Sequence, residues 1–219
     1  LGTAQLDDRR YYGLPLYMPH NHGAQSNLVL LKAATTFGRP EWAVKARQRI
    51  LRDYNEVFSD CGISREQSSA YHLYNTRLWE KLAKEADLPR HLKVAQAGSA
   101  LVRPDGVLEE IGDGSKDNQQ ANGGGLWCPQ EGWAAGAKSG MHYTLRFGPP
   151  RAMHGHVDKG SITWFTRGTP VLSDRGTADK KNATELTWSR GVAAHSVLEA
   201  VGRSNDDPMT GRKRGASAY

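Results

Sequence analysis

The spacing of hydrophobic positions changes near residue 98. Before it, apolar residues recur every three to four positions, as on one face of an α-helix. After it, apolar and polar residues alternate in short segments, as in half-buried β-strands. Glycine follows the same division, because only five of the 24 glycines precede residue 98. We therefore expect a helical region over 1–97 and a β-rich region over 98–219, an α+β multidomain organisation.

Three long helices are predicted in the first region. One covers 23–37 and ends at Gly38, a residue that favours helix C-termini. The next covers 40–58 and starts with a proline, which is well tolerated in a first turn. The third covers 64–86. Helices of this length joined by short loops pack as antiparallel hairpins.

The third predicted helix carries two tyrosines of interest. Ser64 and Gln67 have the spacing of a capping box at its start. Tyr74 falls on the apolar stripe and is expected in the core. Tyr71 lies next to that stripe, and packing is the ordinary role of a lone tyrosine. Its hydroxyl can nevertheless transfer a proton if neighbouring cations lower its pKa.

The second region reads as an antiparallel sheet, either open or folded into a β-sandwich. Residues Pro104-Asp105-Gly106 form a turn signal between two short strands. Longer alternating segments lie at 141–147, 161–166, 170–173 and 193–201. The stretch 113–125, rich in Gly, Asn and Gln, is expected to be a polar loop.

The chain is basic and polar, with a net charge of +6 and a mean hydropathy of −0.64. Such a surface favours an acidic partner, either nucleic acid or an acidic polysaccharide, although a generally basic surface is also common. The basic residues are scattered and form no nucleic-acid-binding motif, so we expect no nucleic-acid partner. No apolar run of membrane-spanning length occurs, and no membrane span is expected. The chain begins at Leu1 without a leader pattern, as in a mature or truncated protein.

Two cysteines, Cys61 and Cys128, lie far apart in sequence. This arrangement favours buried or free thiols over a framework disulfide and does not fix the compartment.

The segment His20-Asn21-His22-Gly23 precedes the first predicted helix. Asn21 fits the helix N-cap, a purely structural role. His22 beside it is well placed to meet an anion, since free backbone N–H groups and the helix dipole favour negative charge there.

Histidine and aspartate residues in the second region supply the ligand types that zinc takes. His154 and His156 are separated by one residue and followed by Asp158, while Asp174 and His195 come later. If a strand already includes both His154 and His156, they face the same way. If it begins later, they can serve two different tasks. The spacing alone does not distinguish a metal site from ordinary polar groups of a sheet.

Five motifs, in this order, resemble the heparinase II/III-like polysaccharide lyases, which include heparin-sulfate, alginate and oligoalginate lyases. The resemblance covers roughly residues 10–200, and it implies an (α/α) toroid portion followed by an antiparallel β-sandwich. The family toroid has more helices than this chain, so we expect a piece that lacks part of the toroid and the last strands. The motifs are Asn21-His22-Gly23, Glu66 with Tyr71-His72, His154-Gly155-His156 with Asp158, Asp174-Arg175-Gly176, and Ala194-His195-Ser196.

The resemblance also implies roles for individual residues. Tyr71 is expected to transfer protons, and Asn21, His22 and His154 to surround the uronate carboxylate and the reacting carbon. The chemistry requires such groups, because the C5 proton of a uronate is weakly acidic until charge on the carboxylate is stabilised.

The remaining expected roles concern metal and substrate. The resemblance makes His156, Asp174 and His195 ligands of a structural divalent metal, most plausibly zinc. The substrate-binding residues are then expected to be Glu66, Arg65, Arg146 and Arg151, although each arginine is also typical of an ordinary surface charge.

The function expected from the resemblance is β-elimination on a uronic-acid-containing polysaccharide by a secreted or periplasmic lyase, and a homo-oligomer is left open. One alternative is a metal-stapled carbohydrate-binding protein without turnover. Another is a glycoside hydrolase that uses the carboxylates of Glu66 and Asp158. The sequence does not determine which uronate polysaccharide is cleaved, or whether cleavage is endo or exo.

Overall fold

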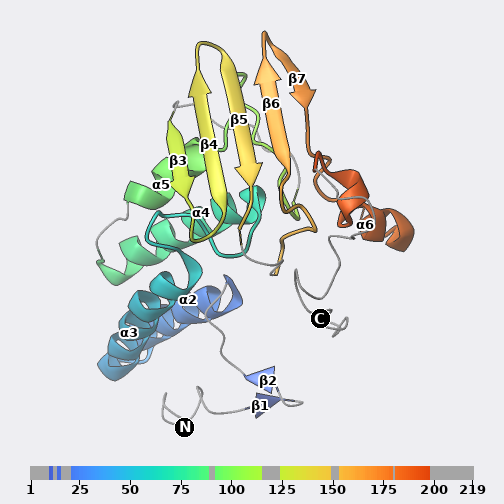
Figure 1. The fold of residues 1–219 in the computed structure, drawn as a ribbon. Helices are drawn as coiled ribbons and strands as arrows, with labels where there is room; N and C mark the ends of the chain where they lie inside the picture. Colours follow the sequence, from blue (N-terminus) through green and yellow to red (C-terminus); the bar gives the residue numbers. More distant parts are fainter. Residues whose placement is uncertain are drawn as a thin grey trace. The chain divides into compact units, whose positions relative to one another are not determined.

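The computed structural model describes residues 10–11, 14–15, 21–88, 92–114, 124–148, 153–179 and 181–197. The chain forms two compact units, defined by which residues contact one another in space. Figure 1 labels the helices and strands of both. The first comprises Leu1–Asp60 and Tyr74–Leu92, and the second Cys61–Leu73 and Lys93–Tyr219. Each unit therefore consists of two separate stretches of the chain. The domain boundary at 97/98, which rests on composition and periodicity, stays a prediction.

The first unit is mainly helical. Its helices are α2 (Asn21–Thr36), α3 (Pro40–Val57) and most of α4 (Ser69–Ala86), preceded by a small antiparallel pair, β1 (Arg10–Tyr11) and β2 (Leu14–Pro15). The predicted helices over 23–37 and 40–58 are thus confirmed to within two residues. The toroid portion expected over 1–97 is not present, because the described residues of this region supply too few helices for one.

The start of α4 differs from the prediction. Gln67 has a positive φ of 57°, a backbone conformation that cannot continue a helix. The helix begins at Ser69 instead, and the Ser68 hydroxyl accepts a hydrogen bond from the backbone N–H of Tyr71 at 3.1 Å, as an N-cap side chain does. The capping box of Ser64 and Gln67 was therefore wrong. Tyr74, expected in the core, is 40% exposed and accepts a hydrogen bond from Gln25.

The second unit is built on one five-stranded antiparallel sheet in which each strand pairs with the next along the chain. Helix α5 (Leu92–Ser99) precedes the sheet, and α6 (Ala183–Ser189) and the 3₁₀-helix η1 (Val192–Ala194) follow it. The strands are β3 (Gly125–Cys128), β4 (Trp133–Lys138), β5 (Met141–Arg146), β6 (Ile162–Thr166) and β7 (Thr169–Leu172).

Several predictions for this region are corrected. The alternating segments at 141–147, 161–166 and 170–173 are strands, but the described part of 193–201 forms η1 and a loop. The turn at 104–106 is present, but the residues on either side of it form only an isolated β-bridge, Val102 to Leu108, in place of two strands. The described residues contain one five-stranded sheet and not the two facing sheets of a sandwich.

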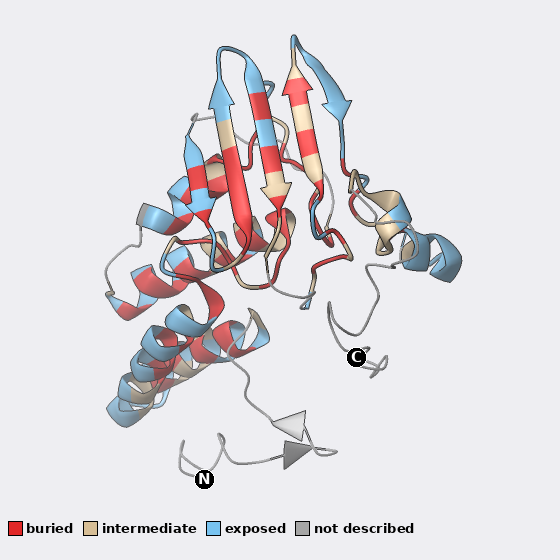
Figure 2. Ribbon diagram, in the orientation of Figure 1, coloured by how far each residue is buried: buried red, intermediate tan, exposed pale blue. Residues whose placement is uncertain are grey.

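One face of the sheet is buried (Figure 2). Trp133 of β4 is fully buried and belongs to an apolar cluster with Ile63, Leu101 and Leu108. On β5 the buried side chains are the polar ones, His142, Thr144 and Arg146. Each has a polar partner: His142 Nε2 lies 2.9 Å from the Ala100 carbonyl and Thr144 Oγ1 2.6 Å from Thr163 Oγ1, while Arg146 donates to the Gly132 carbonyl at 2.7 Å.

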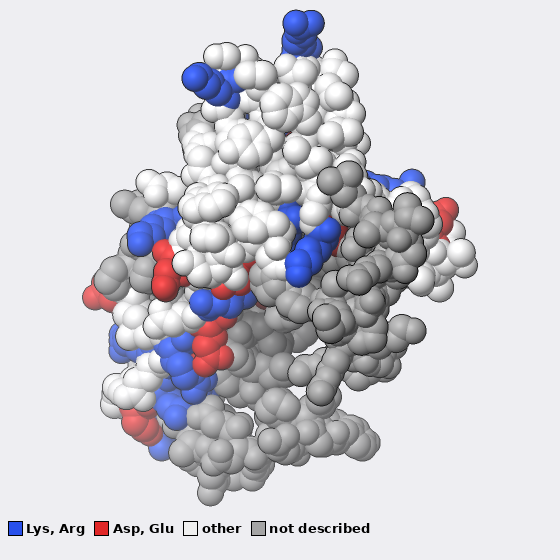
Figure 3. All heavy atoms as spheres, viewed as in Figure 1, with Lys and Arg blue, Asp and Glu red and all other residues white. Residues whose placement is uncertain are grey.

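The opposite face of the sheet is exposed and apolar. Trp127, Tyr143 and Met141 are 69%, 40% and 37% exposed, and the Trp127 and Phe147 rings stack with centroids 5.7 Å apart. This face carries few charged groups in the space-filling view (Figure 3). Hydrophobic periodicity alone therefore does not identify the buried side of β5.

A disulfide joins Cys61 and Cys128, whose Cα atoms are 5.8 Å apart. The expectation of free or simply buried cysteines was wrong, because folding brings together two residues 67 positions apart in sequence. The bond links the segment before α4 to the end of β3 within the second unit. Among the described helices, none is long and apolar enough to span a membrane.

Candidate active site

Tyr71 and His154 stack face to face in the second unit. Their ring centroids are 3.4 Å apart and their planes differ by 7°. Tyr71 lies in the first turn of α4, and His154 lies in the loop that precedes β6. The Nε2 atom of His154 is also 3.5 Å from a carboxylate oxygen of Glu66, which is buried. The structure thus brings together three of the residues predicted for catalysis and substrate binding.

The backbone of His154 is held on both sides. Its N–H donates to the Glu66 carbonyl at 3.1 Å, and its carbonyl accepts from the Asp113 N–H at 2.7 Å. These bonds fix the loop that carries His154 against the segment before α4 and against the backbone of Asp113.

Asp113 contacts both histidines of the His-Gly-His segment. Its Oδ2 lies 3.3 Å from His154 Nδ1, and its Oδ1 lies 3.0 Å from His156 Nε2. Arg190, at the C-terminal end of α6, donates to both oxygens at 2.9 and 2.5 Å. Burial by itself would raise the pKa of the Asp113 carboxyl, but hydrogen bonds from His154, His156 and Arg190 hold it far below its usual value.

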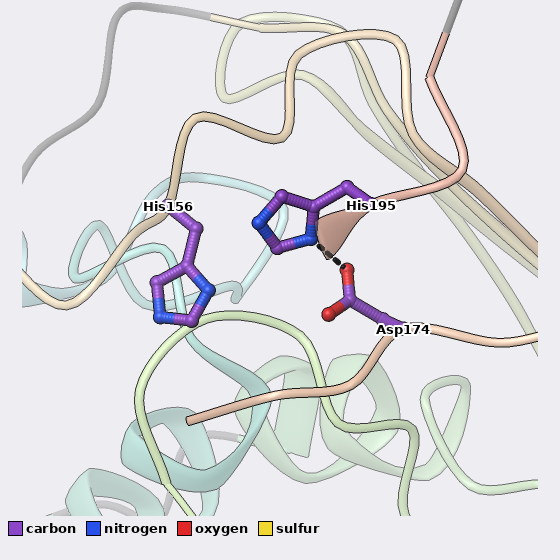
Figure 4. A group of neighbouring side chains, drawn as sticks. All are labelled: His156, Asp174 and His195. Carbon is purple, nitrogen blue, oxygen red and sulfur yellow. Dashed lines mark hydrogen bonds and ion pairs between the residues drawn. The ribbon is translucent and has the colours of Figure 1, made fainter. Parts of the chain in front are cut away.

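His156, Asp174 and His195 form a buried cluster (Figure 4). One potential ligand atom from each residue lies within 4.8 Å of those of the other two. Asp174 Oδ2 is 2.8 Å from His195 Nδ1, and its other oxygen accepts from the Gly176 N–H at 2.9 Å. Strand β6 begins only at Ile162, so His154 and His156 both precede it. They share Asp113, but His154 stacks on Tyr71 whereas His156 belongs to the cluster.

The nitrogens of this cluster fit a metal ion. His156 Nδ1 and His195 Nε2 are buried and have no hydrogen-bond partner among the described residues. Buried polar atoms are rarely left unpaired, and two imidazoles with a carboxylate are a donor set that zinc accepts. His156 also contacts Asp113 through its other ring nitrogen, the arrangement in which a carboxylate orients a metal-binding imidazole.

Electrostatics around the cluster involve a further carboxylate. Burial raises the pKa of Asp158, while Arg146, with Nε 3.8 Å from Asp158 Oδ2, acts in the opposite direction. Burial would lower the pKa of His195, but the hydrogen bond and negative charge of Asp174 raise it overall.

Comparisons with known proteins point to one family. Residues 121–218 match the family model for the heparinase II/III-like C-terminal domain. This region of the chain is therefore similar to a heparinase II/III-like C-terminal domain. No curated protein matches the chain.

Solved structures with a similar fold include heparinases. A heparinase III with methylated lysines has a TM-score of 0.73 at 14% identity, covering 92% of this chain and 38% of that one. The heparan sulfate lyase HepC from Pedobacter heparinus has a TM-score of 0.70 at 17% identity, covering 86% of this chain and 38% of that one. At these identities the similarity establishes the fold, and the chain spans 38% of the length of either protein.

The predicted substrate-binding arginines differ in their surroundings. Arg146 is buried, and its guanidinium lies 4.2 Å from the centroid of the Trp133 ring. This burial favours a structural role over contact with substrate. Arg65 is 41% exposed in its side chain and pairs with Glu131 at 2.9 Å. Arg151 lies outside the described residues.

Asn21 and His22 are the first two residues of α2 and belong to the first unit. Glu66, Tyr71, His154 and the metal cluster all belong to the second unit. The roles of Asn21 and His22 beside the uronate carboxylate stay predictions.

No pattern in the sequence pointed to Asp113, Thr177 or Arg190. Asp113 falls at the start of a stretch expected to be a polar loop, and an aspartate is common in such loops. Thr177 donates to the Asp113 carboxylate at 3.3 Å. Arg190 is 77 residues from its partner, so no spacing rule pairs them. The contacts among Asp113, Thr177 and Arg190 are formed only when the chain folds.

Proposed function

We propose that this chain contributes the active site of a polysaccharide lyase that cleaves a uronic-acid-containing polysaccharide by β-elimination. The observation that carries the proposal is the stacked pair Tyr71 and His154, with Glu66 beside it. The candidate metal cluster includes His156, two residues further along the loop of His154. The heparinase-like family match and the fold similarity support the same reaction class.

In the proposed reaction, a base removes the C5 proton of the uronate, and the C4–O bond breaks with its electron pair going to the leaving oxygen. A C4–C5 double bond forms, and Tyr71 protonates the leaving oxygen. Either Tyr71 or His154 takes the C5 proton. Donors beside the carboxylate stabilise the charge that develops there, a role we propose for Asn21 and His22.

We further propose that His156, Asp174 and His195 hold a divalent ion, with zinc the best match to two imidazoles and a carboxylate. The unpaired buried nitrogens support this assignment. The bound ion supplies structural stabilisation, because its ligands come from three segments of the second unit that metal binding ties together.

Of the two alternatives, the two-carboxylate hydrolase has the weaker support. Both Glu66 and Asp158 are buried, and Asp158 lies against Arg146. A carbohydrate-binding protein without turnover would keep the metal cluster but would not need the hydroxyl of Tyr71.

The experiment that tests the proposal is an assay of the full-length protein with a panel of uronate polysaccharides, including heparan sulfate, heparosan, alginate and hyaluronan. A lyase releases an unsaturated uronate, which absorbs in the ultraviolet. Saturated products from the same panel would identify a hydrolase, and binding without product would identify a binding protein.

The disulfide between Cys61 and Cys128 supports a secreted or periplasmic location, because structural disulfides persist in oxidising compartments. The exposed apolar face of the sheet supports a second β layer in the whole protein, as in a β-sandwich.

A further inference from the structure

We propose that Asp113 is a positioning residue that holds the proposed metal ligand His156 and the proposed catalytic residue His154 in fixed orientations through its two carboxylate oxygens. The inference rests on the proposed lyase function and metal site, and it adds a residue that lies outside the region matched by the family model.

The two oxygens of Asp113 have separate tasks. Oδ1 is 3.0 Å from His156 Nε2, and Oδ2 is 3.3 Å from His154 Nδ1. A carboxylate only accepts hydrogen bonds from these rings, so each contacting nitrogen carries the proton. His156 is thereby left with a lone pair on Nδ1, the buried atom without a partner in the described structure. His154 is left with Nε2 directed at Glu66.

Asp113 is itself rigidly held. Arg190 donates to both oxygens, and Thr177 donates to Oδ1. The backbone N–H of Asp113 donates to the His154 carbonyl, and its own carbonyl accepts from the Ser68 hydroxyl at 2.5 Å. The carboxylate is only 5% exposed, so little water competes for these bonds.

The residue before Asp113 allows this close approach. Gly112 has a φ of +72°, and a Cβ at this position would lie 2.5 Å from the Gln67 carbonyl oxygen and 2.7 Å from that of His154. Only glycine fits there without displacing the backbone. The loop is therefore wedged between the segment before α4 and the segment that carries His154.

Asp113 connects the proposed catalytic residues with the proposed metal site. The Ser68 hydroxyl, which bonds to the Asp113 carbonyl, also caps α4 at Tyr71. Asp113 thus contacts the segments that carry Tyr71, His154 and His156. Carboxylates behind metal-binding histidines set their tautomer, and their loss typically weakens metal binding about 10–100-fold.

The first test uses the unaltered full-length protein with ¹⁵N-labelled histidine, in which nitrogen chemical shifts report the tautomer. We expect His156 to carry its proton on Nε2 and to bind added zinc through Nδ1. A proton on Nδ1, or no response of His156 to zinc, would overturn the proposal. This measurement does not depend on the folding of any variant.

The second test replaces Asp113 by asparagine. An amide offers one acceptor oxygen in place of two, so one histidine must face an N–H group. We expect D113N to weaken zinc binding about 10–100-fold in a chelator competition. With zinc saturating, we expect kcat to fall while KM stays within about twofold, because catalytic geometry is lost while substrate contacts remain.

The matched control is D105N. Asp105 is also paired with an arginine, Arg103, through both oxygens, but it lies in a surface turn of the same unit. D105N should keep wild-type zinc affinity and kcat. Unchanged zinc affinity in D113N, or an equal loss in both variants, would show that Asp113 does not position the histidines. Failure of the lyase proposal can be distinguished from failure of this one. The protein would then form no unsaturated product, but zinc affinity and the histidine nitrogen shifts could still be measured.

Discussion

The ring of Tyr71 lies parallel to the ring of His154, with centroids 3.4 Å apart, although the two residues are 83 positions apart in the chain. A helix start supplies the first ring and a loop before a strand supplies the second. The contact places two side chains that can each transfer a proton next to one another.

Removing the Tyr71 hydroxyl should abolish most turnover while leaving the fold intact. In Tyr71→Phe the ring and its stacking on His154 remain, so the free energy of unfolding should change by about 1 kcal/mol or less. Turnover should fall about 10² to 10⁴-fold, the range for loss of a general acid or base. Product formation and urea unfolding measure the two effects.

Tyr74→Phe is the matched control, because Tyr74 lies on the same helix, is exposed and bonds to Gln25. It should retain turnover. Near-normal turnover in Tyr71→Phe would make Tyr71 a packing residue and exclude the proposed mechanism.

Asn21→Ala should also lower turnover, because stabilisation of the substrate carboxylate is lost, and raising the pH should not restore it.

Removal of the proposed metal should lower both melting temperature and activity. The ligands come from the loop before β6, the segment after β7 and the end of η1, so an ion there ties these segments together. We expect elemental analysis of protein purified without chelator to give one equivalent of divalent metal. A preparation with no stoichiometric metal, or a melting temperature insensitive to chelator, would contradict the prediction.

Loss of the Cys61–Cys128 disulfide should destabilise the second unit. The bond closes a loop with a sequence separation of 67. In the chain-entropy model a loop of this size corresponds to about 4 kcal/mol, and measured losses are typically about 2–5 kcal/mol. The double variant Cys61→Ala with Cys128→Ala should show this loss in urea unfolding. Reductant should lower the stability of the unaltered protein and leave the double variant unaffected.

Stability should fall at mildly acidic pH because of His72. The side chain is fully buried, its Nδ1 accepts from the Ser64 N–H, and its Nε2 lies 3.0 Å from the Val94 carbonyl. Burial lowers the pKa of His72 from its ordinary value of 6.5 to about 4. The unfolded chain then takes up the proton first, so stability is lost as pH falls from about 6.5 to about 4 and is constant below.

The loss attributable to His72 should approach roughly 3 kcal/mol. It is measured as the difference in urea midpoint between pH 7 and pH 4.5 for the unaltered protein and for His72→Gln. Other titrating groups contribute equally to both proteins. A pH dependence that is the same in both would show that His72 is not buried in its neutral form.

Much of the helical pattern could be predicted because it depends on neighbours along the chain. The limits of α2 and α3 follow from apolar spacing and from Gly38 and Pro40. The start of α4 could not, because neither the positive φ of Gln67 nor the bond from the Ser69 N–H to the Ile111 carbonyl leaves a sign in the local sequence. The buried side of β5 also escaped prediction, since its polar residues find partners on distant segments and its apolar residues face outward.

The proposed metal cluster was the part of the site most accessible from sequence. His156, Asp174 and His195 have the ligand types of a zinc site, and the structure brings them together. Asp113 was not accessible, because its importance arises from contacts with residues 41 to 77 positions away. A single aspartate in a glycine-rich stretch carries no local sign of such contacts.

The interleaving of the two units has a consequence for chimeric proteins. An exchange of residues 121–218 between relatives would transfer His154 and His156 but leave Tyr71 and Asp113 from the recipient. Each new combination would then have to rebuild the ring stacking and the carboxylate contacts across the splice. A crossover immediately upstream of Cys61 would instead let all four of these residues be inherited from one parent.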